Sequence, residues 1–418
     1  MTTIFILGRE PAISISELLS VFKREHNNFE IEAVDSEFIL ARHVDTDLFE
    51  LMTKLGGIVK IAGVLGEVSS LESAADFCTR ELNRAGQKKF GISLYGNIPD
   101  KLRAGHRLGM IVKRALKDDG HVRLVTALVQ PLSSATVLKE KLIDQGAEFV
   151  IVPHQKKLFV GITAAIQPLE EFAAADMNRP RRNLLAGMIP PKLARMMVNL
   201  AAVPLAASAA QNEPAILDPF CGGGTIIAEA LRLGYKNVVC SDVSAAAVSA
   251  ARENLSAISD RPKFLVSDVR ALLTKLSPAS IDAIITEPTL GPPLHGNESP
   301  EKIRRTATEL EDLYASAIAV FTKILKPGGR AVFVSPVFSV KQSRDLKSRG
   351  QKIKNQNAAY WQFLRTAEIF QKFGFTLTPL LPPELLKKFK HTTEYGTLLY
   401  ARPDQHIGRE IIVARGQF

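Results

Sequence analysis

From residue 191 onward, the sequence alternates between short apolar segments typical of strands and longer amphipathic segments typical of helices. The expected strands are AILD, NVVCSD, KFLVSD, IDAIITE and RAVFVSP, and the expected helices cover 192–203, 224–233, 245–256 and 308–325. Strands and helices that take turns along a chain predict a doubly wound parallel sheet with helices on both faces. This pattern places the last part of the chain in the α/β class.

A glycine-rich turn follows the first of these strands, in the segment AILDPFCGGGTIIAEAL (215–231). Gly222–Gly224 let the backbone approach a ligand where a Cβ atom would clash, and the next helix N-terminus presents unpaired N–H groups. The spacing is not the G-x-G-x-x-G of a dinucleotide site, because Ile227 stands at the third glycine position. Asp218, just before the turn, instead suits the charged amino-acid end of S-adenosylmethionine.

Two further acids end the next strands. Asp242 ends NVVCSD, where a carboxylate can accept hydrogen bonds from both ribose hydroxyls of a nucleoside. Asp268 ends KFLVSD, where it can lie beside the adenine amine of such a cofactor. One acid at a strand end is a weak signal, since aspartate is an ordinary turn residue. Three acids at successive carboxyl ends of parallel strands predict a binding site.

The first 166 residues show a different order of elements. Strands are expected at 3–7, 37–42 and 60–68, with helices at 13–25 and 45–55 between them, which suits a small α+β unit. A second α/β unit then has expected strands at 88–96 and 122–128, a strand pair within 148–166, and helices at 102–120 and 133–146. The segment after it has no clean period and includes prolines and an arginine cluster, so we expect a connector there.

The net charge of +10 is unevenly distributed along the chain. Residues 1–75 carry six basic against twelve acidic side chains, residues 76–195 carry 20 against 11, and residues 196–418 carry 27 against 20. A basic middle segment suggests a polyanionic partner, nucleic acid first, because such patches neutralise phosphates. The alternative, in which the lysines and arginines are merely solvated, stays open at this point.

Composition and cysteine spacing limit the class of protein. A hydrophobic fraction of 46% with 23% charged residues excludes wholesale disorder and a fibre. Cys78, Cys221 and Cys240 have no CxxC spacing, so we expect no metal site and no disulfide framework. The apolar N-terminus is too short for a signal peptide, and the longest apolar run, LAAVPLAASAA, is too short for a membrane span. We expect a soluble, cytoplasmic protein without membrane association.

The chain resembles the class I RNA methyltransferases that carry a THUMP domain, specifically the tRNA guanine-N2 methyltransferase group. The resemblance rests on DPFCGGGT (218–225), GMIPPKLARMMVNLA (187–201), LSSATVLKEKLIDQGAEFVIV (132–152) and the order of the elements. It implies a ferredoxin-like domain at 1–68, a THUMP RNA-binding domain at 69–166, a linker at 167–190 and a Rossmann-like methyltransferase domain at 191–418. With S-adenosylmethionine as cofactor, the predicted binding residues are Asp218, Pro219, Phe220, Cys221, Gly222, Gly224, Thr225, Asp242 and Asp268.

The resemblance also implies a substrate loop of the form D-P-P-Y-G after the fourth strand. Here the aligned stretch is TEPTLGPPL (286–294), so the predicted catalytic residues are Glu287, Pro288, Thr289 and Leu290. Glu287 can accept a hydrogen bond from the guanine amine and help a proton to leave. The loop departs from the pattern, because Leu290 replaces the stacking aromatic and the second proline is displaced. Either another group clamps the base, with Trp361, Tyr360 and Phe363 as candidates, or the activity is weakened.

Three basic segments are candidates for contact with RNA. The connector carries NRPRRN (178–183), the helix at 102–120 is basic and amphipathic, and the segment 341–365 interleaves Lys and Arg with aromatic residues. A solvated charged surface remains the alternative for each segment. The predicted RNA-binding residues are Arg179, Arg181, Arg182, Lys113, Arg114 and Trp361. The C-terminal segment 394–414 is expected to form an antiparallel strand pair that closes the sheet.

These observations favour a tRNA methyltransferase that forms N2-methylguanosine while the THUMP region grips the acceptor end. Two alternatives stay open. One is a DNA or protein amine or amide methyltransferase, although the loop lacks the Asn and Tyr of an N-P-P-Y motif. The other is an RNA-binding relic that keeps the fold without the activity. The resemblance leaves the modified nucleotide and a small activating subunit undetermined.

Overall fold

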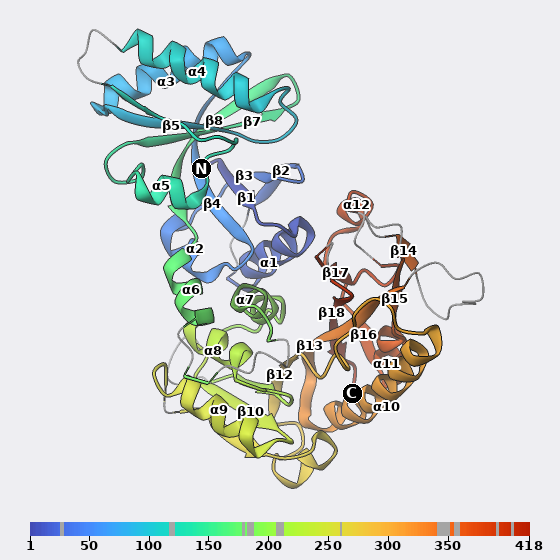
Figure 1. The fold of residues 1–418 in the computed structure, drawn as a ribbon. Coiled ribbons are helices and arrows are strands. Elements are labelled where there is room, and N and C mark those ends of the chain that lie inside the picture. The colour runs from blue at the N-terminus through green and yellow to red at the C-terminus, as the bar shows by residue number, and fades with distance from the viewer. Residues whose placement is uncertain are drawn as a thin grey trace. The chain divides into compact units, whose positions relative to one another are not determined.

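A computed structural model describes residues 1–25, 29–116, 122–177, 180–181, 188–205, 213–259, 261–340, 352–354, 360–389, 393–402 and 405–418. The chain divides into two compact units, which Figure 1 shows in the colour order of the sequence. Unit 1 comprises Met1–Ile15 and Glu25–Phe172, and unit 2 comprises Ser16–Arg24 and Ala173–Phe418. The division falls within helix α6 (Leu169–Met177), so part of the predicted connector is helical.

Unit 1 is built on a single eight-stranded sheet in the order β2-β3-β1-β4-β8-β7-β5-β6. The pairs β5–β6 and β5–β7 are parallel, and the others are antiparallel. The sheet crosses the expected domain boundary at residue 68, because β4 pairs with β8 from Lys60 opposite Ile166 to Val68 opposite Leu158. The strands are β1 (Thr3–Leu7), β2 (Glu30–Val34), β3 (Phe38–Arg42), β4 (Ile58–Val68), β5 (Lys89–Leu94), β6 (Arg123–Val125), β7 (Ala147–His154) and β8 (Lys157–Ile166).

The helices of unit 1 begin where the sequence offers side-chain caps. Asp47, Ser70, Asp100 and Ser133 each accept a hydrogen bond from the backbone N–H three residues on, which satisfies one of the unpaired donors of a first turn. Helices α3 and α4 pack on each other and share a buried apolar cluster with β5, β7 and β8. The helices are α1 (Pro11–Arg24, shared with unit 2), α2 (Leu48–Lys54), α3 (Leu71–Ala85), α4 (Lys101–Ala115) and α5 (Ser134–Lys139).

Unit 2 contains the doubly wound sheet that the alternating pattern predicts. The order is β11-β10-β9-β12-β13-β15-β14, and β18 pairs with β13, β16 and β17. The first five strands are parallel, and β18 is antiparallel to β13 and β17, which confirms the expected closing strand pair. The strands are β9 (Ala215–Asp218), β10 (Asn237–Asp242), β11 (Lys263–Val266), β12 (Ile281–Thr286), β13 (Leu325–Val340), β14 (Lys352–Lys354), β15 (Tyr360–Phe363), β16 (Phe375–Leu377), β17 (Leu398–Tyr400) and β18 (Ile407–Gly416).

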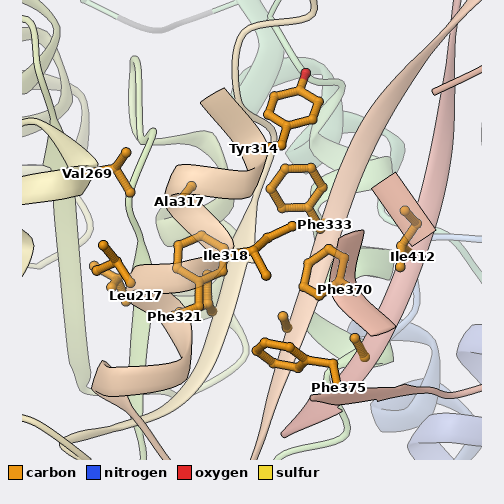
Figure 2. Packing of buried hydrophobic residues seen from close by; sticks show 14 of the residues in the cluster. Leu217, Val269, Tyr314, Ala317, Ile318, Phe321, Phe333, Phe370, Phe375 and Ile412 are labelled. Carbon is orange, nitrogen blue, oxygen red and sulfur yellow. The ribbon is translucent and has the colours of Figure 1, made fainter. Parts of the chain in front are cut away.

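One face of this sheet carries a large apolar cluster of unit 2. Figure 2 shows Tyr314, Ile318 and Phe321 with Phe333 and Phe370 in that cluster. Its residues come from the sheet, η3, α10 and α11, and none comes from α7, α8 or α9. The helical elements are α7 (Pro191–Leu200), α8 (Thr225–Arg232), α9 (Ala245–Leu255), η3 (Val269–Thr274, a 3₁₀ turn), α10 (Pro300–Ile324), α11 (Thr366–Lys372) and α12 (Pro383–Leu386).

Helix α10 begins earlier than the expected start at residue 308. Ser299 accepts a hydrogen bond from the Lys302 N–H, and Pro300 occupies the first helical position, where its missing N–H costs nothing. Within the described part of the chain, no helix combines the length and the apolar character that crossing a membrane requires.

Strand β9 lies at the point where the direction of winding reverses. The chain proceeds from β9 to β10 and β11 on one side, and then returns to β12 and β13 on the other. Ligands of open α/β sheets bind outside the carboxyl ends of the strands at such a reversal. The topology therefore directs attention to the residues that follow β9, β10, β11 and β12.

Candidate functional site

Four acids line the carboxyl edge of the parallel sheet. Asp218 and Asp242 are the last residues of β9 and β10, Asp268 follows β11, and Glu287 follows β12. Because the strand order is β11-β10-β9-β12, the acids succeed one another across the edge as Asp268, Asp242, Asp218 and Glu287. The structure thus brings together the three acids that the sequence assigns to the cofactor and the acid that it assigns to the substrate.

The glycine turn between β9 and α8 requires glycine at two positions. Gly222 has φ +49° and Gly224 has φ +82°, a region that side chains rarely adopt. A Cβ atom at Gly224 would lie 3.3 Å from Ala251 Cβ and 3.2 Å from a methyl group of Leu255, whereas at Gly222 it would meet nothing within 4 Å. Gly224 therefore serves packing on α9, and Gly222 borders open space at the start of α8.

Asp218 is the most deeply buried of the four acids. Only 1% of the residue is exposed. Its Oδ1 accepts hydrogen bonds from Thr286 Oγ1 at 2.7 Å and from the Phe220 N–H at 3.1 Å. Burial raises the pKa of Asp218 to about 7, and the nearby Asp242 and Glu287 act in the same direction, while these two hydrogen bonds oppose the rise. The carboxyl is poised to ionise when a cation comes close.

Asp242 ties the glycine turn to the next strand. Its Oδ2 accepts a hydrogen bond from the Gly222 N–H at 3.0 Å, and its Oδ1 accepts one from the Ser244 N–H at 2.9 Å. Each carboxylate oxygen has a second lone pair for a ligand hydroxyl. The residue is half-buried, so a ligand at this edge can reach it.

Asp268 is more exposed and is already engaged with its own loop. It accepts a hydrogen bond from the Arg270 N–H and forms an ion pair with the Arg270 guanidinium at 2.6 Å. The side-chain hydrogen bond with Arg270 is the largest cause that holds the pKa of Asp268 at about 2. A ligand amine at this position would have to share the carboxylate with Arg270.

The loop after β12 is anchored by residues that sequence reasoning did not single out. Glu287 forms an ion pair with Arg409 of β18 at 2.5 Å, and both side chains are about nine-tenths buried. Burial raises the pKa of Glu287, while Arg409 lowers it. Tyr314 of α10 donates a hydrogen bond from its hydroxyl to the Thr289 carbonyl at 2.6 Å. Pro288 is buried and Leu290 is half-buried beside them.

No local pattern could have identified these anchors. Arg409 lies in a strand whose sequence indicates only an antiparallel partner, and Tyr314 lies on the apolar face of a long helix. Thr286 is likewise an ordinary strand residue until its hydroxyl is placed on Asp218. Each becomes functional only through a contact with a distant segment.

The expectation that Trp361 stacks on an RNA base is wrong. Trp361 is 4% exposed and packs in a buried cluster with Val337, Phe363 and Leu399. Phe363, a second candidate for clamping the target base, is 5% exposed in the same cluster. Aromatic side chains on one strand of a packed sheet are consumed by the core rather than offered to a ligand. The side chain of Tyr360 lies outside the described residues.

The predicted RNA-binding arginines of the connector are only partly described. Arg179 and Arg182 lie outside the described residues. Arg181 is exposed and forms an ion pair with Glu253 at 2.8 Å. Its backbone N–H and carbonyl both bond the Asn254 amide, and Asn254 also donates to the Gly223 carbonyl at 3.0 Å. The connector is therefore linked to the glycine turn at Arg181, through Asn254.

Unit 1 contains a pocket of about 310 Å³ beside the basic helix α4. Its polar lining includes Arg103, His106 and Arg107 from α4 and Gln130 from the facing loop. The tip of that loop carries Leu128, which is 93% exposed, and Val129, which is 69% exposed. The predicted RNA-binding residues Lys113 and Arg114 are exposed near the end of the same helix. A basic concave surface with exposed apolar side chains thus lies in the segment with the largest positive charge.

Cysteine and metal chemistry find little support in the described residues. Cys221 in the glycine turn is 5% exposed, and a hydrogen bond with Cys240 together with burial raises its pKa, which keeps the thiol neutral. Among the residues that the structure describes, no group of three or more His, Cys, Asp or Glu side chains could hold a metal ion.

Comparison with known proteins places these features in context. Residues 179–359 match the family model described as "RMKL-like, methyltransferase domain". The tRNA (guanine(10)-N2)-dimethyltransferase of Methanocaldococcus jannaschii is 33% identical over 168 residues, which cover 38% of this chain and 45% of that protein. The protein of the same name from Methanothermobacter thermautotrophicus is 36% identical over 157 residues, which cover 37% and 42%. The chain thus spans less than half the length of these curated relatives.

A solved structure extends the similarity to the whole chain at the level of the fold. The crystal structure of TrmN from Thermus thermophilus covers 100% of both chains with a TM-score of 0.55 and 17% sequence identity. At this identity the match concerns the fold alone. The comparisons confirm the predicted α/β class, with a methyltransferase fold in the C-terminal part of the chain.

Proposed function

We propose that this chain is an S-adenosylmethionine-dependent methyltransferase that methylates the exocyclic N2 of a guanine in tRNA. The observation that carries the proposal is the row of acids Asp268, Asp242, Asp218 and Glu287 beside the glycine turn, at the point where the winding of the sheet reverses. The similarity of residues 179–359 to a methyltransferase domain supports the reaction class. The names of the two archaeal relatives support guanine in tRNA as the acceptor.

The residues at the carboxyl edge fit S-adenosylmethionine. Asp218 would face the positively charged amino-acid end, Asp242 would accept hydrogen bonds from the ribose hydroxyls, and Asp268 would meet the adenine amine. The buried carboxyl of Asp218, with its pKa near 7, gains most from a cationic ligand. Gly222 leaves open space where a side chain would otherwise stand. The bound cofactor supplies an electrophilic methyl group on a sulfonium centre.

Glu287 is the residue that would receive the methyl acceptor. The guanine amine is a poor nucleophile because its lone pair is delocalised into the ring. The site must therefore align the nitrogen with the methyl group and accept a hydrogen bond from one of its N–H groups. The Glu287 carboxylate can accept that hydrogen bond and help the proton to leave. A guanine within a stem would first have to be extruded from the helix. Glu287, Pro288, Thr289 and Leu290 form the loop that would receive it.

Unit 1 would supply the grip on tRNA. The pocket beside α4, with Arg103 and Arg107 in its lining, offers guanidinium groups to phosphates, and Leu128 offers an apolar surface to a base. Within the same proposal, residues 1–68 form a ferredoxin-like domain and 69–166 a THUMP domain, although the two share one sheet. Residues 167–190 are the linker and 191–418 the methyltransferase domain. Cytoplasmic location belongs to the proposal as well.

The experiment that tests this function is methyl transfer from labelled S-adenosylmethionine into total tRNA from a strain that lacks the gene. Nucleoside analysis should find the label in N2-methylguanosine or N2,N2-dimethylguanosine. Label in a methylated adenosine or cytidine would overturn the assignment. Activity on DNA or protein with none on tRNA would favour the other class of amine or amide methyltransferase.

Two variants separate cofactor binding from chemistry. Asp242→Ala should abolish binding of S-adenosylmethionine, because it removes the acceptor for the ribose and the bond to the Gly222 N–H. Glu287→Ala should keep the cofactor affinity and lose turnover. Equal loss of binding in both variants contradicts the assignment of roles. Wild-type protein that binds tRNA but not the cofactor would identify an RNA-binding relic.

A further inference from the structure

The contact between Glu287 and Arg409 joins two elements that are far apart in the sequence. Arg409 Nε lies 2.5 Å from Glu287 Oε1, whereas Arg409 Nη2 lies 3.5 Å from Oε2. The two oxygens are therefore held unequally: Oε1 accepts the short bond and Oε2 only the long one, so Oε2 keeps the greater capacity to accept another hydrogen bond. The ion pair is about nine-tenths buried, so water screens it weakly.

Glu287 needs a cation because its surroundings oppose a negative charge. Burial raises the pKa of Glu287, and the charge of Glu287 in turn raises the pKa of Asp218 on β9 and of the Tyr314 hydroxyl on α10. Arg409 on β18 forms the ion pair with Glu287. Like charges in one buried site cannot both ionise cheaply without such a partner.

The residue that precedes the same strand packs on the segment just after the substrate loop. A Cβ atom at Gly296 would lie 2.4 Å from the ring of His406, so the backbone there packs directly on the residue before β18. The His406 carbonyl in turn accepts a hydrogen bond from the Ser339 N–H of β13 at 2.9 Å. The chain is thus fixed beside the closing strand at Glu287 and, just beyond the loop, at Gly296, while Tyr314 holds the Thr289 carbonyl between them.

We propose that Arg409 is a positioning residue that keeps the Glu287 carboxylate charged and directs its second oxygen to the amino group of the methyl acceptor. The proposal rests on the function proposed above and assigns to β18 a part in it. A charged carboxylate matches guanine, whose amino group stands beside an N–H donor. A charged carboxylate disfavours adenine and cytosine, because the ring nitrogen beside their amino group carries a lone pair that repels a carboxylate oxygen. The ion pair therefore favours guanine among the three bases that carry an amine.

The test compares Arg409→Met with Arg409→Lys and with Arg415→Met. Arg415 is the matched control, because it lies on the same strand, is exposed, and is not part of the site. Single-turnover methyl transfer to tRNA is measured from pH 5.5 to 9 in the full-length protein, together with the calorimetric affinity for S-adenosylmethionine.

In Arg409→Met, the acid limb of the rate profile should move about one to three pH units upward, because Glu287 loses its cation. The rate should recover at high pH, and the cofactor affinity should stay within about twofold of wild type. Arg409→Lys should show a smaller shift, and Arg415→Met should show none. A loss of rate that is equal at every pH, or an unchanged profile, overturns the proposal.

A second measurement is independent of activity. Unfolding in urea, followed through Trp361, is compared at pH 5 and pH 8 for wild type, Arg409→Met and the double variant Arg409→Met/Glu287→Gln. The single variant should lose more stability than wild type between these pH values, and the double variant should lose no more than wild type. If the single variant loses no more stability than wild type, Arg409 does not keep Glu287 charged. If the expected result is obtained but tRNA is not methylated, the proposed function fails and the ion pair stands.

Discussion

Substitution of Asp218 by Asn should stabilise unit 2 at neutral pH while removing cofactor binding. Asn keeps the shape and the acceptor oxygen for Thr286 and Phe220, but it carries no charge. Burial raises the pKa of Asp218 from 3.8 to about 7. A rise of about three pH units corresponds to about 4 kcal/mol of unfolding free energy, as an order of magnitude.

The sign follows from the direction of the pKa change. Between pH 4 and 7 the folded protein holds a proton on Asp218 that the unfolded chain releases, so stability falls as pH rises through this range. Above pH 7 the full cost of the buried charge is present. Wild-type protein should therefore lose stability between pH 5 and pH 8, and Asp218→Asn should lose less by up to about 3 kcal/mol.

Trp361 makes this measurement specific to unit 2. It is the single tryptophan of the chain and lies buried in unit 2, so its fluorescence reports the unfolding of that unit in urea. Glu410→Gln is a parallel variant, because burial also raises the pKa of Glu410 to about 7. Its effect on the pH dependence of stability should add to that of Asp218→Asn. The reasoning is refuted if Asp218→Asn loses as much stability between pH 5 and pH 8 as wild type.

Three further outcomes are expected. Affinity for S-adenosylmethionine should be roughly tenfold weaker at pH 6 than at pH 7.5, because the cation of the cofactor requires Asp218 to ionise. Calorimetry checks this, and an affinity of wild type that does not change with pH contradicts a contact between Asp218 and the cation. Gly224→Ala should destabilise unit 2 by about 1–3 kcal/mol and weaken cofactor binding, since φ is +82° and the added Cβ would crowd Ala251 and Leu255. Urea unfolding followed by Trp361 fluorescence measures the loss of stability, and Gly223→Ala is the milder control. Lys60→Met should destabilise unit 1 by about 3–5 kcal/mol, because Lys60 forms a buried ion pair with Glu148 at 2.5 Å. Hydrogen exchange of the backbone amides of β5 and β7 measures this, and the double variant Lys60→Met/Glu148→Gln should restore their protection.

The parallel sheet and the acids at its edge could be predicted because their signals are local. Each strand is a short apolar run, and its last residues are read directly from the chain: Asp218 after AIL, Asp242 after VVCS and Glu287 after AIIT. Parallel strands have their carboxyl ends on the same edge, so these acids meet without further information. The strand β2 and helix α3 escaped prediction, and the expected break at residue 68 lies within one continuous sheet.

The sequence by itself determined the alternation of strands and helices in unit 2, the glycine turn and the order of acids along the sheet edge, since the spacing of residues within one segment encodes each of them. Only the tertiary structure decided that Trp361 is buried, that β4 joins β8 across the expected boundary, and that Arg409 holds Glu287 from 122 residues away. These outcomes depend on which distant segments pack together, and the free energy of that packing is shared among the whole core rather than written in either segment.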